Sequence, residues 1–206
     1  MSIYGANIGT PPVTAQYDGA GLYPTTLGNT TVTFNGAAAP LLYVSTGLIN
    51  AVVPYAVAGQ KTVDVIVTHD SQKSPPLSIP IVDTSPGVFS VGQNGSGQGA
   101  ILNALTNAPF TLNSVDNPVP MGSYIVMYTT GPGLWNQTVP DGSILLVVRE
   151  PPYFVPAAKV SLTIGGQPAT MSYAGAAPYM VSGMLQVNAI VPPGIGSGPQ
   201  PVVLTI

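Results

Sequence analysis

The residues best suited to chemistry in this chain are few, and three of them are adjacent. His69, Asp70 and Ser71 supply an imidazole, a carboxylate and a hydroxyl, the groups of a nucleophilic triad. Consecutive residues in one turn cannot place these groups in line, because a triad is assembled from separate segments. We therefore expect this stretch, with Lys73 beside it, to be a solvated hairpin loop. Any hydrolase assisted by histidine would depend on His69, which is the single histidine.

Paired carboxylates are the groups that hydrolyse glycosidic bonds, and the chain has one pair close in sequence. Asp141 and Glu150, the single glutamate, flank an expected strand at 144–148. A strand rise of about 3.3 Å per residue separates them by well over ~20 Å, whereas glycosidase carboxylates lie about 5 to 10 Å apart. Arg149 beside Glu150 is better interpreted as a surface ion pair of small energetic value. These residues therefore predict no glycosidase site.

A carbohydrate-binding loop is a second possible use of the chain's polar groups. Trp135, the only tryptophan, is followed by Asn136 and Gln137, with Asp141 a few residues on. An exposed indole can stack on a sugar ring while amides bind its hydroxyls, so polysaccharide stands as an alternative partner. The competing interpretation is that Trp135 packs against the end of its own domain. We favour packing because tryptophan is highly buried on average.

The composition excludes several function classes. The 206 residues include 4 Lys or Arg and 7 Asp or Glu, for a net charge of −3, and no cysteine. Without a basic cluster we expect no nucleic-acid partner. Without cysteine, and with one histidine, we expect neither thiol chemistry nor a metal site built on several imidazoles, and we predict no cofactor. No apolar stretch is long enough for a membrane-spanning helix, so we expect no membrane insertion.

The same composition predicts an all-β fold. With 24 Gly and 23 Pro and few polar helix formers, helices are disfavoured. Short runs rich in Val, Ile, Thr and Tyr, bounded by Gly, Pro, Asn or Asp, predict strands that pack as antiparallel sandwiches. The expected strands lie at 32–34, 41–44, 48–53, 62–67, 77–82, 100–103, 124–128, 144–148, 160–164, 170–173, 184–191 and 201–206.

An internal repeat divides the chain. Val32–Gly36 (VTFNG) has its counterpart in Leu162–Gly166 (LTIGG), and Asn50–Pro54 (NAVVP) has its counterpart in Asn188–Pro192 (NAIVP). Because the motifs recur in the same order, we predict two related β-sandwich domains. The expected organisation is a first sandwich at 1–84, a connector with a β-hairpin at 85–118 and a second sandwich at 119–206.

The order of several short motifs resembles one family. They are Ser2–Gly9 (SIYGANIG), Ala39–Ser45 (APLLYVS), Ser85–Phe89 (SPGVF), Gly97–Asn103 (GQGAILN), Pro140–Gly142 (PDG) and Leu185–Asn188 (LQVN). Together they are similar to the uncharacterised C-terminal domain family abundant in large secreted proteins of soil acidobacteria of the Solibacter type. The halves of that family resemble IPT/TIG immunoglobulin-like modules. The resemblance implies an extracellular tandem of Ig-like sandwiches, and it transfers no catalytic residue because the family has no agreed activity.

The second repeat is shorter than the first. After Pro54 the first repeat continues through two expected strands, whereas after Pro192 the residues up to Ile206 suffice for one. A sandwich without its final strand has an unpaired edge and an apolar groove, and such an edge accepts a strand from elsewhere. We predict an assembly edge at Pro201, Val203, Thr205 and Ile206. A dispensable strand, with the short edge simply tolerated, is an equally weighted alternative.

These observations favour a noncatalytic extracellular module that spaces, adheres or assembles, with a second copy or a neighbouring chain as its partner. Low charge and an open edge promote association. We expect a location outside the cell or on its surface, with a signal peptide that is not part of this chain. The alternatives are the carbohydrate-binding module at Trp135 and, with less support, a hydrolase with an unrecognised nucleophile.

Overall fold

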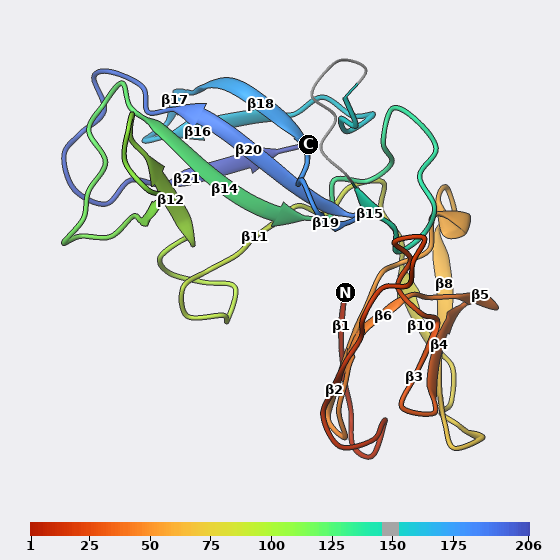
Figure 1. The fold of residues 1–206 in the computed structure, drawn as a ribbon. Coiled ribbons are helices and arrows are strands. Elements are labelled where there is room, and N and C mark those ends of the chain that lie inside the picture. Colours follow the sequence, from red (N-terminus) through yellow and green to blue (C-terminus); the bar gives the residue numbers. More distant parts are fainter. Residues whose placement is uncertain (146–152) are drawn as a thin grey trace. The chain divides into compact units, whose positions relative to one another are not determined.

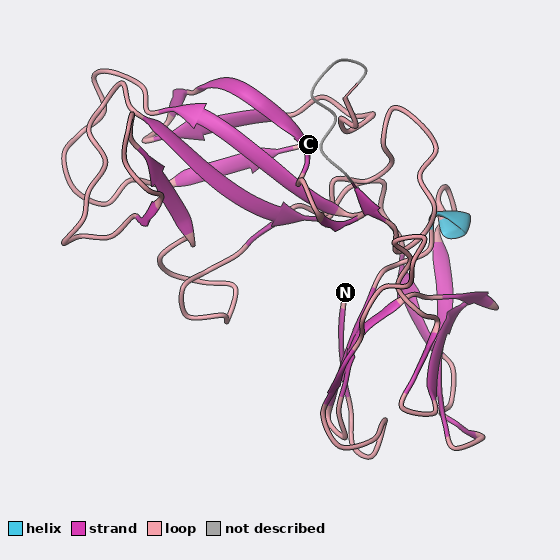
Figure 2. Ribbon diagram, in the orientation of Figure 1, coloured by secondary structure: helices cyan, strands magenta, loops and turns pink. Residues whose placement is uncertain are grey.

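A computed structural model describes residues 1–145 and 153–206, and it confirms the all-β prediction. Antiparallel strands make up the regular structure of these residues, apart from the short 3-10 helix η1 (Tyr55–Val57) (Figure 2). None of their helices is long and apolar enough to cross a membrane. The chain divides into two compact units. Unit 1 comprises Met1–Asp83, Thr138–Leu146 and Tyr179–Ser182, and unit 2 comprises Thr84–Gln137, Val147–Pro178 and Gly183–Ile206.

Unit 1 is a sandwich of two sheets (Figure 1). The first has the order β1 (Ser2–Tyr4), β7 (Leu48–Ala51), β6 (Leu41–Val44) and β2 (Val13–Thr14). The second has the order β10 (Leu77–Pro80), β8 (Thr62–His69), β4 (Thr30–Phe34) and β3 (Thr26–Leu27), with β5 (Ala37–Ala38) on β4 and β9 (Gln72–Lys73) on β8. Alternate residues of both sheets meet in one apolar core, as period-2 patterning requires.

Unit 2 has a larger sheet and a smaller one. The larger has the order β13 (Thr111–Leu112), β12 (Ile101–Ala104), β14 (Tyr124–Thr130), β20 (Met184–Ile190) and β18 (Thr170–Ala176), with β11 (Gly87–Val88) on β14. The smaller has the order β17 (Gln167–Pro168), β16 (Ser161–Ile164) and β21 (Val202–Thr205). Segment 85–118, where a connector was expected, therefore adds three strands to the sheet of unit 2.

The sequence repeat is also visible in the strand pairing. β6 pairs with β7 in unit 1, and β18 pairs with β20 in unit 2. Both ladders shift register just before a tyrosine, Tyr43 in the first and Tyr173 in the second. Each tyrosine then stands opposite an asparagine, Asn50 or Asn188. The two units therefore share the same local ladder and the same β-bulge.

Two short segments of the second repeat belong to unit 1. They carry β15 (Ile144–Leu145) and β19 (Met180–Val181), which pair with each other. The Ile144 N–H donates to the Gly21 carbonyl over 2.8 Å, and the Tyr23 N–H donates to the Gly142 carbonyl over 3.1 Å. The compact units thus differ from the expected range 119–206. The rest of the strand expected at 144–148, with Arg149 and Glu150, lies outside the described residues.

Candidate functional site

The Trp135 loop is used for packing within unit 2. The indole is only 6% exposed, and Trp135 forms a β-bridge with Pro156. The Asn136 Nδ2 donates to the Tyr153 carbonyl over 3.1 Å, and its Oδ1 accepts from the Val155 N–H over 3.2 Å. The Gln137 Nε2 also approaches the Tyr153 carbonyl, at 3.4 Å. These side chains hold the segment 153–156, and the indole offers no broad exposed face for a sugar ring.

Asp141, the fourth residue of the expected carbohydrate loop, lies in unit 1. Its Oδ1 accepts from the Tyr55 N–H over 2.8 Å, at the start of the 3-10 helix η1. A carboxylate at this position satisfies a backbone donor that the short helix leaves unpaired. The structure therefore does not gather Asp141 with Trp135, Asn136 and Gln137 in one unit.

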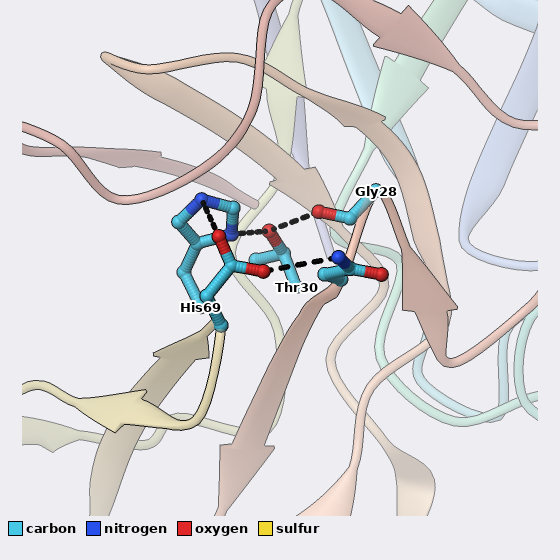
Figure 3. Close-up of polar contacts among 5 residues, drawn as sticks. Gly28, Thr30 and His69 are labelled. Atoms are coloured by element: carbon cyan, nitrogen blue, oxygen red, sulfur yellow. Dashed lines mark hydrogen bonds and ion pairs between the residues drawn. The ribbon is translucent and has the colours of Figure 1, made fainter.

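The His69 region is the other place where chemical groups meet (Figure 3). The Thr30 Oγ1 lies 3.0 Å from the His69 Nδ1 and donates to the Gly28 carbonyl at 3.2 Å. The His69 Nε2 lies 3.4 Å from an oxygen of Asp70. The Thr30 residue is 0% exposed, so its hydroxyl cannot reach a substrate. Ser71 is at the turn of the β8–β9 hairpin, as expected, and the cluster joins two turns of unit 1.

The outer edge of β21 is an edge of the smaller sheet of unit 2. β21 pairs with β16 on one side, and among residues 1–145 and 153–206 no strand pairs with its other side. The Ala169 N–H donates to the Leu162 carbonyl over 2.9 Å, so the Leu162 backbone faces away from β21. Leu162 and Leu204 are therefore an opposed pair without mutual hydrogen bonds. It follows that the backbone groups of Leu204, and of Val202 two residues earlier, point to the open edge.

The proline that precedes β21 does not block this edge. The Gly165 N–H donates to the Pro201 carbonyl over 2.9 Å, which places the backbone of Pro201 on the β16 side. The open edge thus keeps the N–H groups of Val202 and Leu204. Residues 199–206 carry no charged side chain, and so they lack the charges with which many proteins protect an edge strand.

An apolar groove of about 940 Å³ lies beside this edge, within unit 2. Both sheets contribute to its wall, together with the loop that leads to β21. Its apolar lining includes Ile101, Ile125, Ile164, Val191, Ile195 and Val202. A groove between two sheets that ends at an unpaired strand is the kind of site to which an extended peptide can add.

Unit 1 shows what fills the equivalent place. Val202 stands opposite Ile164 as Val65 stands opposite Phe34, so the two ladders correspond residue by residue. On the outer side of β8, Leu77 pairs opposite Val65, and Ile79 two residues on packs against the core. The strand β10 therefore occupies in unit 1 the position that is a groove in unit 2.

The structure also refines the expected edge residues. Val203 is 53% exposed and Thr205 is exposed, and both direct their backbones to β16. The Ile206 carbonyl accepts from the Thr84 Oγ1 over 3.0 Å. The open donors and acceptors belong instead to Val202 and Leu204, between the residues expected from sequence. The repeat makes them equivalent to Val65 and Val67 of unit 1, but the direction of their backbone groups follows only from the register with β16.

Comparison with known proteins adds no relative: no protein family, no curated protein and no solved structure matches the chain. The described residues contain no group of three His, Cys, Asp or Glu side chains that could hold a metal ion.

Proposed function

We propose that the chain is a noncatalytic structural module that joins polypeptide chains by accepting a strand at the open edge of β21. One observation carries the proposal. The backbone groups of Val202 and Leu204 point outward beside a groove, and the equivalent position in unit 1 is occupied by β10. Main-chain hydrogen bonds to an added strand supply affinity, and the groove supplies contacts for alternate side chains.

The placement of the reactive groups supports binding over catalysis. The hydroxyl that contacts His69 belongs to Thr30 and is buried, and Asp70 belongs to the same turn as His69. The carbohydrate alternative has less support than strand addition, because Trp135 is buried and its neighbouring amides bind backbone groups. In our proposal the module serves adhesion or assembly at the cell surface, as the resemblance to secreted Ig-like tandems implies.

A peptide titration tests strand addition directly. The probe is the octapeptide Pro-Pro-Leu-Ser-Ile-Pro-Ile-Val, which is residues 75–82 of the chain and includes β10. We expect it to shift the amide resonances of Val202 and Leu204 in the full chain. The same peptide with Asp in place of its first Ile is the control and should bind at least tenfold more weakly, because a charge would enter the apolar groove.

A matched pair of variants of the chain completes the test. Leu204→Pro removes an N–H at the open edge and should abolish peptide binding. Thr205→Val changes an exposed side chain of the same strand and should leave binding unchanged. Absence of peptide-induced shifts in the folded wild-type chain, or equal binding by a folded Leu204→Pro variant, would overturn the proposed function.

A further inference from the structure

The chain has two Asn-Gly pairs, and their surroundings differ. They are Asn35-Gly36 in unit 1 and Asn94-Gly95 in unit 2. In such a pair the backbone nitrogen of the glycine can attack the side-chain carbonyl carbon of the asparagine, because a glycine has no Cβ to hinder the close approach. The carboxamide nitrogen then leaves as ammonia. Whether a given pair reacts depends on what holds its carboxamide.

Asn94 lies in the loop between β11 and β12, within unit 2. A β-bridge between Ser90 and Gly99 closes this loop, and the Val91 N–H donates to the Gln98 carbonyl over 2.8 Å. Asn94 itself is exposed. Water therefore reaches its side chain, and ammonia can leave from it.

Hydrogen-bond donors converge on the side-chain oxygen of Asn94. The Ser96 N–H donates to the Asn94 Oδ1 over 3.1 Å, and the Ser96 hydroxyl donates to it over 3.2 Å. The Ser90 hydroxyl approaches the same oxygen at 3.5 Å. Because negative charge develops on this oxygen when a nucleophile adds to Cγ, the donors stabilise the tetrahedral intermediate more than they stabilise the neutral amide.

The attacking nitrogen has a proton acceptor beside it. The Gly95 N–H donates to the Ser90 Oγ over 3.0 Å. A backbone amide is a weak nucleophile while it keeps its proton, so a hydroxyl that accepts this hydrogen bond assists the attack. Ser90 thus contacts both reacting groups, the nitrogen of Gly95 and the oxygen of Asn94.

The carboxamide of Asn35 is held in a different way. Its Oδ1 accepts from the Asp64 N–H over 2.7 Å, and its Nδ2 donates to the Gln60 Oε1 over 2.6 Å. Asn35 and Gly36 form the two-residue turn between β4 and β5, with φ values of 47° and 84°. Turning the Asn35 amide toward the Gly36 nitrogen would break both side-chain hydrogen bonds, so the structure protects this pair.

We propose that Asn94 is a site of self-modification, at which Ser90 and Ser96 promote attack of the Gly95 nitrogen on the Asn94 side chain. The N–Cγ bond forms while the Gly95 proton passes to the Ser90 Oγ and the Ser90 proton passes to the Asn94 Oδ1. The Cγ–Nδ2 bond then breaks, and Nδ2 takes up that proton and leaves as ammonia. A cyclic succinimide remains, and water opens it at either carbonyl to give aspartate or isoaspartate.

The product changes the loop in two respects. It adds one negative charge to a chain whose net charge is −3, and the isoaspartate form adds a carbon atom to the backbone. Residues 95–98 of this loop line the groove of unit 2, so the modification falls beside a wall of that groove. The inference does not depend on strand addition at β21, because its test measures a covalent change of the loop.

Peptide mapping by mass spectrometry tests the site in the folded chain. During incubation at mildly alkaline pH, we expect Asn94 to convert to aspartate and isoaspartate at least about tenfold faster than Asn35, because only the Asn94 side chain is placed for attack. A synthetic peptide of residues 91–99 in the same buffer gives the rate without the folded loop and without Ser90. Asn94 in the chain should react about fivefold faster than in this peptide.

Serine variants identify the groups responsible. Ser90→Ala removes the acceptor of the Gly95 proton and should slow the conversion of Asn94 about tenfold, less than a proton-transfer group contributes in a closed active site. Ser96→Ala removes one donor to the Asn94 Oδ1 and should slow it about threefold. Ser90→Thr and Ser96→Thr are the matched controls. Each retains the hydroxyl and should keep a rate near that of the wild type.

The outcomes decide the inference in both directions. A faster reaction of Asn94 in the folded chain than in the peptide, slowed by both alanine variants and kept by both threonine variants, is the expected result. If Asn94 in the folded chain reacts no faster than in the peptide, or if the alanine variants react at the wild-type rate, the proposed self-modification is wrong.

Discussion

β8 and β21 are equivalent strands of the two units, and they differ in what covers them. β8 lies between β4 and β10, and its inward side chains are almost fully buried: Val63 is 1%, Val65 is 5% and Val67 is 7% exposed. β21 lies beside β16 alone among the described strands, and its inward Val202 and Leu204 are only partly buried. The repeated ladders therefore build the sandwich in both units, and in unit 1 the additional strand β10 completes the burial of the core side chains of β8.

The largest effect should come from removing that closing strand in unit 1. Ile79→Asp places a charge on the side of β10 that packs against the core, and we expect a loss of about 3 kcal/mol in the free energy of unfolding. β10 should then detach, and the amides of Val63 and Val65 should exchange with solvent. Hydrogen exchange followed by NMR measures both effects. Continued protection of these amides would contradict the claim that β10 covers the edge of β8.

A paired truncation should give the next largest effect. Val65→Ala removes buried methyl groups at a position that is 5% exposed, and it should cost about 2 kcal/mol. Val202→Ala removes the same groups at the equivalent half-buried position, and it should cost about 1 kcal/mol in the monomer. Chemical denaturation at low protein concentration measures the difference. Equal losses would mean that the core around β21 is already complete.

The two bulge tyrosines give a smaller paired effect. The Tyr173 hydroxyl donates to the Ala176 carbonyl over 2.7 Å, whereas among residues 1–145 and 153–206 the Tyr43 hydroxyl has no such partner. We expect Tyr173→Phe to cost about 1 kcal/mol and Tyr43→Phe to stay within about 0.5 kcal/mol of the wild type. Chemical denaturation of the two variants measures both losses in the free energy of unfolding. A larger loss for Tyr43→Phe than for Tyr173→Phe would contradict a stabilising role of the Tyr173 hydrogen bond.

Tyr173 should also leave a signature at high pH. Burial, followed by the nearby Tyr153, raises the pKa of Tyr173 above its ordinary value of 10.0. Because the folded state favours the neutral phenol, this contribution to stability is fully present below pH 10.0 and is lost as the pH rises through the folded pKa. The wild-type chain should therefore lose stability more steeply above that pH than Tyr173→Phe. Equal slopes of unfolding free energy against pH for the wild type and Tyr173→Phe would exclude a contribution from the Tyr173 phenol.

Much of this architecture could be predicted from sequence because it depends on local patterns. Alternating apolar residues and turn residues predicted the strands, and the matched motifs at Val32–Gly36 and Leu162–Gly166 predicted the related ladders. The sequence alone, without register, did not show that Val202 and Leu204 carry the open backbone groups of β21.

Other features depend on contacts between distant segments. Asp141 binds the Tyr55 N–H in unit 1, and no local pattern around either residue indicates that contact. The asparagine and glutamine beside Trp135 bind the backbone of Tyr153 and Val155, so amides that could bind sugar hydroxyls instead hold another segment of the chain. Residue type alone could not distinguish these two uses.

Amide hydrogen exchange along β21 tests the central claim most directly. At low protein concentration, the amides of Val203 and Thr205 should be protected by β16, while those of Val202 and Leu204 exchange at least tenfold faster. With the octapeptide bound, Val202 and Leu204 should become protected as well. Strong protection of Val202 and Leu204 in a dilute monomer would show that the edge is already covered, and that result would contradict the account.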